Sequence, residues 1–160
     1  MMQNVVNAFA REFDASLVCL ADTIAMLSDE DWVRGENNRQ KPVHQACHCL
    51  MGPISYAKVA VDTSRIRFRF KDPKAYPSRR EVLGIIETVR GSLAEYIAGV
   101  VQRTLVEREL HVPPMFKMIY LLRHTIVHLS CLREEAHRRG YRPPVYSKRY
   151  RPGRARNPVS

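Results

Sequence analysis

Apolar residues recur every three or four positions in four segments of the chain, and this spacing predicts four amphipathic helices. The first helix covers about residues 5–27, the second about 42–61, and the last about 115–139. The third begins at residue 78 and ends between residues 105 and 110. Because each helix has an apolar stripe to bury, the pattern predicts an all-α domain with a common core. The stripe of the first helix is Val6, Phe9, Phe13, Leu17, Leu20, Ile24 and Leu27.

Residue types with known roles at helix ends mark several boundaries. Pro42 suits a first helical turn. Ser78 and Glu81 have the spacing of a capping box, and Gly140 follows the last helix as a C-terminal cap. Residues 28–32 predict a short capped turn, in which Trp32 forms a lid over the end of the bundle.

The connection between the second and third helices, at residues 62–77, is long. Short loops join antiparallel neighbours, whereas a long connection permits a crossover. Within it, Ile66, Phe68 and Phe70 alternate with arginines, which predicts an extended segment with one apolar edge. We therefore expect a four-helix bundle with a long crossover between helices two and three.

Length and composition change this picture little. A chain of 160 residues fits one domain, and it can bury a core without a disulfide or metal staple. No apolar run approaches the roughly 18 residues of a membrane span. We interpret the N-terminus as the start of the first helix, not as a signal peptide. Free thiols in a reducing cytoplasm are the simplest interpretation of the four cysteines, which are Cys19, Cys47, Cys49 and Cys131.

The net charge of +10 is concentrated at the C-terminus. Residues 138–160 hold eight of the 26 basic residues and no acidic one, so the remainder, with 18 basic and 16 acidic residues, is nearly neutral. We divide the chain into a helical domain at 1–140 and a basic, flexible tail at 141–160. A solvated tail is the simplest interpretation. The alternative is weak, sequence-tolerant contact with nucleic acid through phosphates and the interleaved tyrosines.

Four of the six histidines form two pairs at i, i+4 spacing, His44 with His48 and His124 with His128. Residues four apart lie on one helix face, so two imidazoles can converge on one ion. A third imidazole from a facing helix would complete a three-ligand site with an open position, which is typical of catalytic zinc. For His124 and His128 we favour metal binding over the alternative of histidines satisfied within the core.

Three neighbouring residues have open roles. His44 lies in the first turn of its helix, and is either outside the ligand set or a surface residue. Cys131 shares a face with His128, and is either a fourth ligand or, as we favour, a small buried side chain. Tyr120 either orients a bound ligand or is a core tyrosine with an exposed hydroxyl. No catalytic general base can be assigned, and there is no phosphate-binding loop or nucleophile elbow.

Two segments resemble the DinB/YfiT-like proteins. Residues 40–52, QKPVHQACHCLMG, resemble that family's second-helix signature, in which a polar loop leads into a helix bearing a histidine and then a leucine. Residues 121–133, LLRHTIVHLSCLR, resemble its last helix, with the pattern H-x-x-x-H-L. The element order and the long connection are also similar, over about residues 1–145. The resemblance implies a divalent metal ion, zinc or nickel, bound by His48, His124 and His128.

The resemblance also implies a function. Characterised relatives include transferases and isomerases that use low-molecular-weight thiols such as bacillithiol or mycothiol, and the family often forms homodimers. We therefore expect a metal-dependent enzyme, a thiol S-transferase or a hydrolase, acting on a small molecule. The alternative is a non-catalytic, metal-binding, dimeric stress or interaction protein whose tail contacts an acidic partner. Neither His44 nor the basic tail belongs to the family pattern.

Overall fold

The computed structural model describes residues 2–56, 76–95, 97–99 and 114–144, and the regular secondary structure in these ranges is helical. This confirms the expected all-α class. None of the described helices is long and apolar enough to cross a membrane. The helices are α1 (Met2–Met26), α2 (Asp29–Val33), α3 (Pro42–Tyr56), α4 (Arg79–Gly91) and α6 (Pro114–Arg138).

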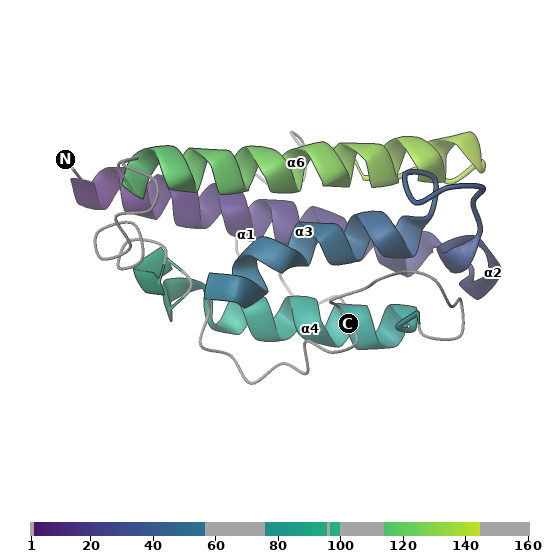
Figure 1. The fold of residues 1–160 in the computed structure, drawn as a ribbon, viewed down its shortest axis with the longest axis horizontal. Helices are drawn as coiled ribbons and strands as arrows, with labels where there is room; N and C mark the ends of the chain where they lie inside the picture. The colour runs from purple at the N-terminus through teal and green to yellow at the C-terminus, as the bar shows by residue number, and fades with distance from the viewer. Residues whose placement is uncertain (1, 57–75, 96, 100–113, 145–160) are drawn as a thin grey trace, which may run out of the picture.

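The long helices α1, α3, α4 and α6 lie side by side along the long axis of the molecule (Figure 1). Both α1 and α3 pack against α6 on one side and against α4 on the other. Their apolar stripes meet in one core, in which Phe13, Leu50, Ile86 and Leu132 are completely buried. Each long helix thus contributes to the interior, as its periodicity predicts.

Polar contacts between the helices establish their directions. Arg79 pairs with Asp29 while Arg90 pairs with Asp14, so α4 runs antiparallel to α1. Tyr141, just beyond α6, donates a hydrogen bond to Asp31 just beyond α1, so these two helices run in the same direction.

The direction of α3 follows in the same way. Gln45, near its start, contacts His128, and Cys49 contacts the Thr125 carbonyl, so α3 runs antiparallel to α6. Consequently α3 and α4 run in the same direction, although they are consecutive long helices. The end of α3 and the start of α4 therefore lie at opposite ends of the molecule (Figure 1).

The predicted helix ends are confirmed by their hydrogen bonds. Ser28 caps α2, and the buried Trp32 donates from Nε1 to the Pro77 carbonyl at 2.7 Å. Ser78 and Glu81 form the full capping box of α4. Gly140 follows α6 with φ 86°, a left-handed conformation that glycine adopts without steric cost.

One predicted helix is interrupted within its length. The third predicted helix, expected to end between residues 105 and 110, is interrupted after Gly91 at Ser92, and residues 93–95 and 97–99 are helical again. Glycine and serine are both weaker helix formers than alanine, which is the physical reason for a break there. Other parts of the prediction lie outside the described residues. These are the end of the second helix near residue 61, the alternating stretch at residues 66–70, the end of the third helix between residues 105 and 110, and the tail from residue 145.

Arg139 joins α6 to α2 and to the loop that precedes α3. Its guanidinium forms ion pairs with Asp31 at 3.2 Å and with Glu135 at 2.7 Å, and all three side chains are largely buried. It also donates to the backbone carbonyls of Arg34 and Gln40. One side chain therefore fixes the relative positions of three segments at this end of the molecule.

We predict that Arg139→Ala lowers the free energy of unfolding by about 3 kcal/mol, because removal of one member leaves two buried carboxylates without their main cation. Urea denaturation followed by circular dichroism measures this change. Arg138→Ala is the matched control, because Arg138 is exposed and its closest ion pair is with the exposed Glu134, while Glu135 keeps its shorter pair with Arg139. That variant should lose no more than about 1 kcal/mol. Equal losses for the two variants would contradict this assignment.

Candidate metal centre

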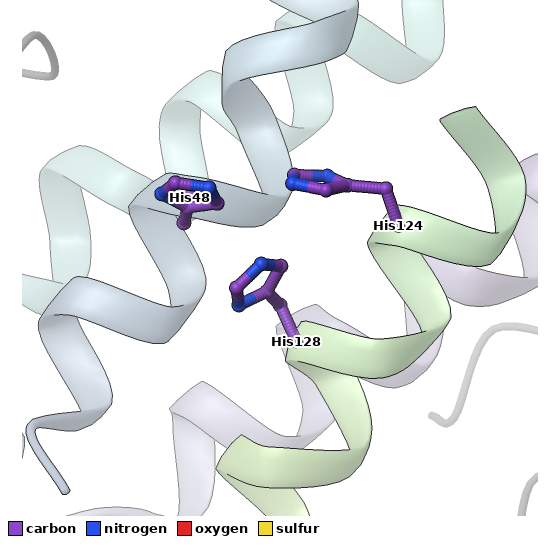
Figure 2. A group of neighbouring side chains, drawn as sticks. All are labelled: His48, His124 and His128. Carbon is purple, nitrogen blue, oxygen red and sulfur yellow. The ribbon is translucent and has the colours of Figure 1, made fainter. Parts of the chain in front are cut away.

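Three imidazoles from two helices converge at the centre of the interface between α3 and α6. His48 comes from α3, and His124 and His128 come from successive turns of α6 (Figure 2). Their ring centroids lie 5.0 Å apart for His48 and His124, 4.3 Å for His48 and His128, and 4.6 Å for the α6 pair. Each ring offers a nitrogen that lies within 4.8 Å of a nitrogen of both others. These three residues are therefore close enough to bind one metal ion.

Close packing of α3 on α6 brings His48 to the α6 pair. Cys49, the residue after His48, is completely buried, and its thiol donates to the Thr125 carbonyl on α6 at 3.5 Å. Thr125, the residue after His124, is also buried. The residues adjacent to two of the histidines thus contact each other, and this contact sets the register of the two helices at the site.

The surroundings keep the histidines in the neutral form that binds metal ions. Partial burial lowers the pKa of His48 below its ordinary value of 6.5. For His124, burial acts first and the charge of a protonated His48 acts second. Burial, together with repulsion from the neighbouring imidazoles, lowers the pKa of His128 to about 4. At neutral pH the cluster therefore presents unprotonated nitrogens.

Gln45 holds His128 in place and is a functional candidate that the sequence analysis missed. Its side chain is 2% exposed, and its Oε1 lies 2.7 Å from Nδ1 of His128. Its Nε2 donates to the backbone carbonyls of Asn38 at 3.3 Å and Arg39 at 3.0 Å. One sequence signal was available, because Gln45 lies three residues before His48 and hence on a neighbouring part of the same helix face.

The other residues with open roles lie outside the three-histidine group. The His44 ring stacks on His48 with centroids 5.7 Å apart, but His44 does not belong to the group whose nitrogens converge. Cys131 is partly buried and does not belong to it either. Tyr120 stacks on His124 at 6.0 Å and is 58% exposed, so it is a surface residue beside the site and not a core tyrosine.

The cysteines within the described residues are free thiols, as the sequence analysis expected. Burial raises the pKa of the Cys47 and Cys49 thiols far above the ordinary value, so both stay protonated at neutral pH. The two thiols nearest to His48 in the sequence are therefore poor candidates for metal ligands or nucleophiles, and they serve the packing of the core.

We predict that the metal-free protein loses stability as the pH falls from about 6.5 towards 4. The unfolded chain takes up protons on its histidines near pH 6.5, whereas the folded state resists this because the pKa of His128 is about 4 and those of the other clustered histidines are also lowered. The unfolded state thus binds more protons in this window, and stability rises with pH. Urea denaturation at pH 7.5, 6.5 and 5.5 measures the slope.

His128→Asn should flatten that pH dependence, because asparagine keeps an amide donor near Gln45 but does not titrate. His137→Asn is the control, since His137 is exposed at the end of α6 and belongs to no cluster in the described structure. Stability that is constant or increasing as the pH falls from 7.5 to 5.5 would contradict the prediction.

The comparisons with known proteins do not identify this chain: no protein-family model, curated protein or solved structure matches it.

Proposed function

We propose that the protein is a metal-dependent enzyme that binds one divalent ion through His48, His124 and His128. The observation that carries the proposal is the convergence of the three imidazoles, from two helices, at distances that one ion can span. All three rings are only partly buried, so the group is accessible from solvent. Three protein ligands leave a coordination position for water or substrate, as in catalytic zinc sites.

The donor set favours Lewis-acid chemistry. The three ligands are neutral imidazoles, and no carboxylate or thiolate of the described residues belongs to the group. A divalent ion held there keeps its full positive charge, and it would lower the pKa of a coordinated thiol or water so that either could act as a nucleophile at neutral pH. This chemistry fits a thiol S-transferase that uses a low-molecular-weight thiol, or a hydrolase. Zinc and nickel both suit imidazole ligands.

The helix directions support the proposal that the fold is a four-helix bundle of the DinB/YfiT-like kind. That arrangement requires a crossover between the second and third long helices. Here α3 and α4 run in the same direction, which is the relation that such a crossover produces between two consecutive long helices. The three histidines that the resemblance implies as metal ligands are also the three whose ring nitrogens converge.

The proposal predicts about one divalent ion per chain after incubation with zinc or nickel and desalting. Loss of a residue that hydrogen-bonds a metal ligand typically weakens metal affinity by roughly 10- to 100-fold. His124→Ala and His128→Ala remove a ligand itself, so each should weaken metal affinity by more than that. Elemental analysis and calorimetric titration measure both quantities. Metal present at 100 times its dissociation constant should stabilise the fold by about 2.7 kcal/mol. His137→Ala is the control, and full occupancy in a His48→Ala, His124→Ala double variant would refute the assignment.

Activity separates the enzyme from the non-catalytic alternative. A metal-loaded enzyme of this class should consume a low-molecular-weight thiol in the presence of an electrophile, or hydrolyse an activated ester. This activity should disappear in His124→Ala. A protein that gains stability from metal but consumes neither substrate would instead support the non-catalytic, metal-binding module.

We further propose that the protein forms a homodimer through the exposed face of α6 and the adjoining part of α1. A groove of about 350 Å³ runs between the two helices, and Val5, Met118 and Ile126 are among the residues that line it. Large contiguous apolar patches on soluble proteins mark interaction surfaces. The exposed large apolar residues of this face are Val5, Met115, Phe116, Ile119, Tyr120, Ile126 and Val127.

Ile119→Glu should convert the dimer to a monomer, because Ile119 is 54% exposed in one chain and a charge there would be buried in the dimer. Analytical ultracentrifugation measures the change in mass. Ser130→Glu, an exposed position on the same helix but beyond the apolar residues, should leave the dimer intact. A wild-type protein that stays monomeric up to the highest soluble concentration would refute this interface.

A further inference from the structure

We infer that Gln45 is a positioning residue that holds His128 in the tautomer whose Nε2 faces the metal. The inference rests on the proposed metal site. It adds that Nε2 is the ligand atom of His128 and that Gln45 selects this atom. It is carried by an unbroken set of contacts from the loop before α3, through the Gln45 amide, to the imidazole of His128.

The orientation of the Gln45 amide follows from its partners. Backbone carbonyls of Asn38 and Arg39 lie 3.3 and 3.0 Å from one end of the amide, and carbonyl oxygens only accept hydrogen bonds. The end that faces them must therefore be the NH₂ group. The opposite orientation would place three oxygens together in a buried setting with no proton between them, which costs free energy.

The tautomer of His128 follows from this orientation. The end of the amide that faces His128 is the carbonyl Oε1, at 2.7 Å from Nδ1. Because Oε1 only accepts, Nδ1 must carry the proton. A neutral imidazole has one protonated nitrogen, so the lone pair lies on Nε2. Gln45 therefore leaves Nε2 as the ligand atom of His128 and reduces the freedom of the ring to turn about its χ2 angle.

The loop that orients Gln45 is closed by contacts of its own. Gly35 has φ 153°, and a Cβ at this position would lie 2.8 Å from the Gln40 carbonyl carbon, so the chain closes tightly there. Arg139 donates to the carbonyls of Arg34 and Gln40 at the two ends of this turn. The acceptors for the Gln45 amide are thus fixed by contacts that do not involve the histidines.

The test measures the tautomer and the metal affinity in separate experiments. Long-range ¹H–¹⁵N correlation spectra of the metal-free protein at pH 7.5 report which ring nitrogen of His128 is protonated, and His128→Asn assigns the signal. The wild type should show protonated Nδ1. Gln45→Leu removes both the acceptor and the donors at nearly constant size, so Nε2 should become protonated in a substantial fraction of molecules. Zinc affinity should fall by roughly 10- to 100-fold.

Two further variants separate positioning from general damage to the structure. Gln45→Glu keeps an acceptor for His128 but cannot donate to the two backbone carbonyls, so its melting temperature should fall. The Nδ1 atom of His128 should nevertheless stay protonated. The zinc affinity of this variant should be closer to that of the wild type than the affinity of Gln45→Leu is. Asn4→Leu makes a similar chemical change at an exposed position of α1, outside the loop that holds Gln45. It should change zinc affinity by less than about twofold.

The outcomes distinguish this inference from the proposed function. Protonated Nε2 on His128 in the wild type would overturn the inference, whether or not the protein binds zinc. Unchanged tautomer and affinity in Gln45→Leu, with zinc binding still abolished in His128→Ala, would overturn the inference and leave the metal site standing. A wild type that binds no zinc would refute the proposed function, while the tautomer would still test the role of Gln45 in positioning the ring. If Gln45→Leu does not fold, the wild-type tautomer and the Gln45→Glu variant decide.

Discussion

The antiparallel packing of α3 against α6 is the constraint on which the candidate site depends. A single helix can bring two imidazoles together through i, i+4 spacing, but only a second helix in the correct register can add the third. The contact from the Cys49 thiol to the Thr125 carbonyl shows that the two backbones approach closely there. A larger residue in place of Cys49 would push the helices apart and move His48 away from His124 and His128.

Partial burial of the imidazoles and the hydrogen bonds of Gln45 both contribute to the site, in different ways. Partial burial and the mutual proximity of the imidazoles disfavour protonation, and therefore keep the nitrogens free for a cation. The same burial would be costly for an unpaired polar group, and Gln45 satisfies Nδ1 of His128 while its own amide hydrogens are satisfied by the backbone. The cluster is consequently compatible with the core even before a metal binds.

Contacts at the end of the molecule beyond the site help to hold α3 and α6 in their relative positions. Arg139 ties the end of α6 to α2 and to the loop before α3, and Trp32 closes the same end through its bond to the Pro77 carbonyl. These contacts lie one or more turns away from the histidines. The Arg139 contact with the Gln40 carbonyl nevertheless holds the start of α3, and with it the positions of Gln45 and His48 along the bundle.

Local features were determined by the sequence alone. The all-α class, the starts of α3, α4 and α6, the capping box at Ser78 and the glycine cap at Gly140 depend on neighbours a few residues away, and the structure bears them out. The same holds for the shared face of His124 and His128. Helix geometry alone sets the positions of residues four apart.

The tertiary structure decided the features that depend on contacts between distant segments. On the residues alone, the place of His44 in the first turn of its helix made it the weaker candidate, and the resemblance then supplied His48 as the third ligand. In the structure, the rotation of α3 against α6 brings the ring of His48, and not that of His44, to His124 and His128. That rotation depends on contacts between side chains about 80 positions apart in the sequence. Gln45 acquires its role only because His128 and the loop carbonyls lie on either side of its amide. The break after Gly91 is a weak local signal that periodicity over a longer window conceals. Spacing along one helix is set by covalent and backbone geometry, whereas register between helices is set by packing, which no single segment of the sequence contains.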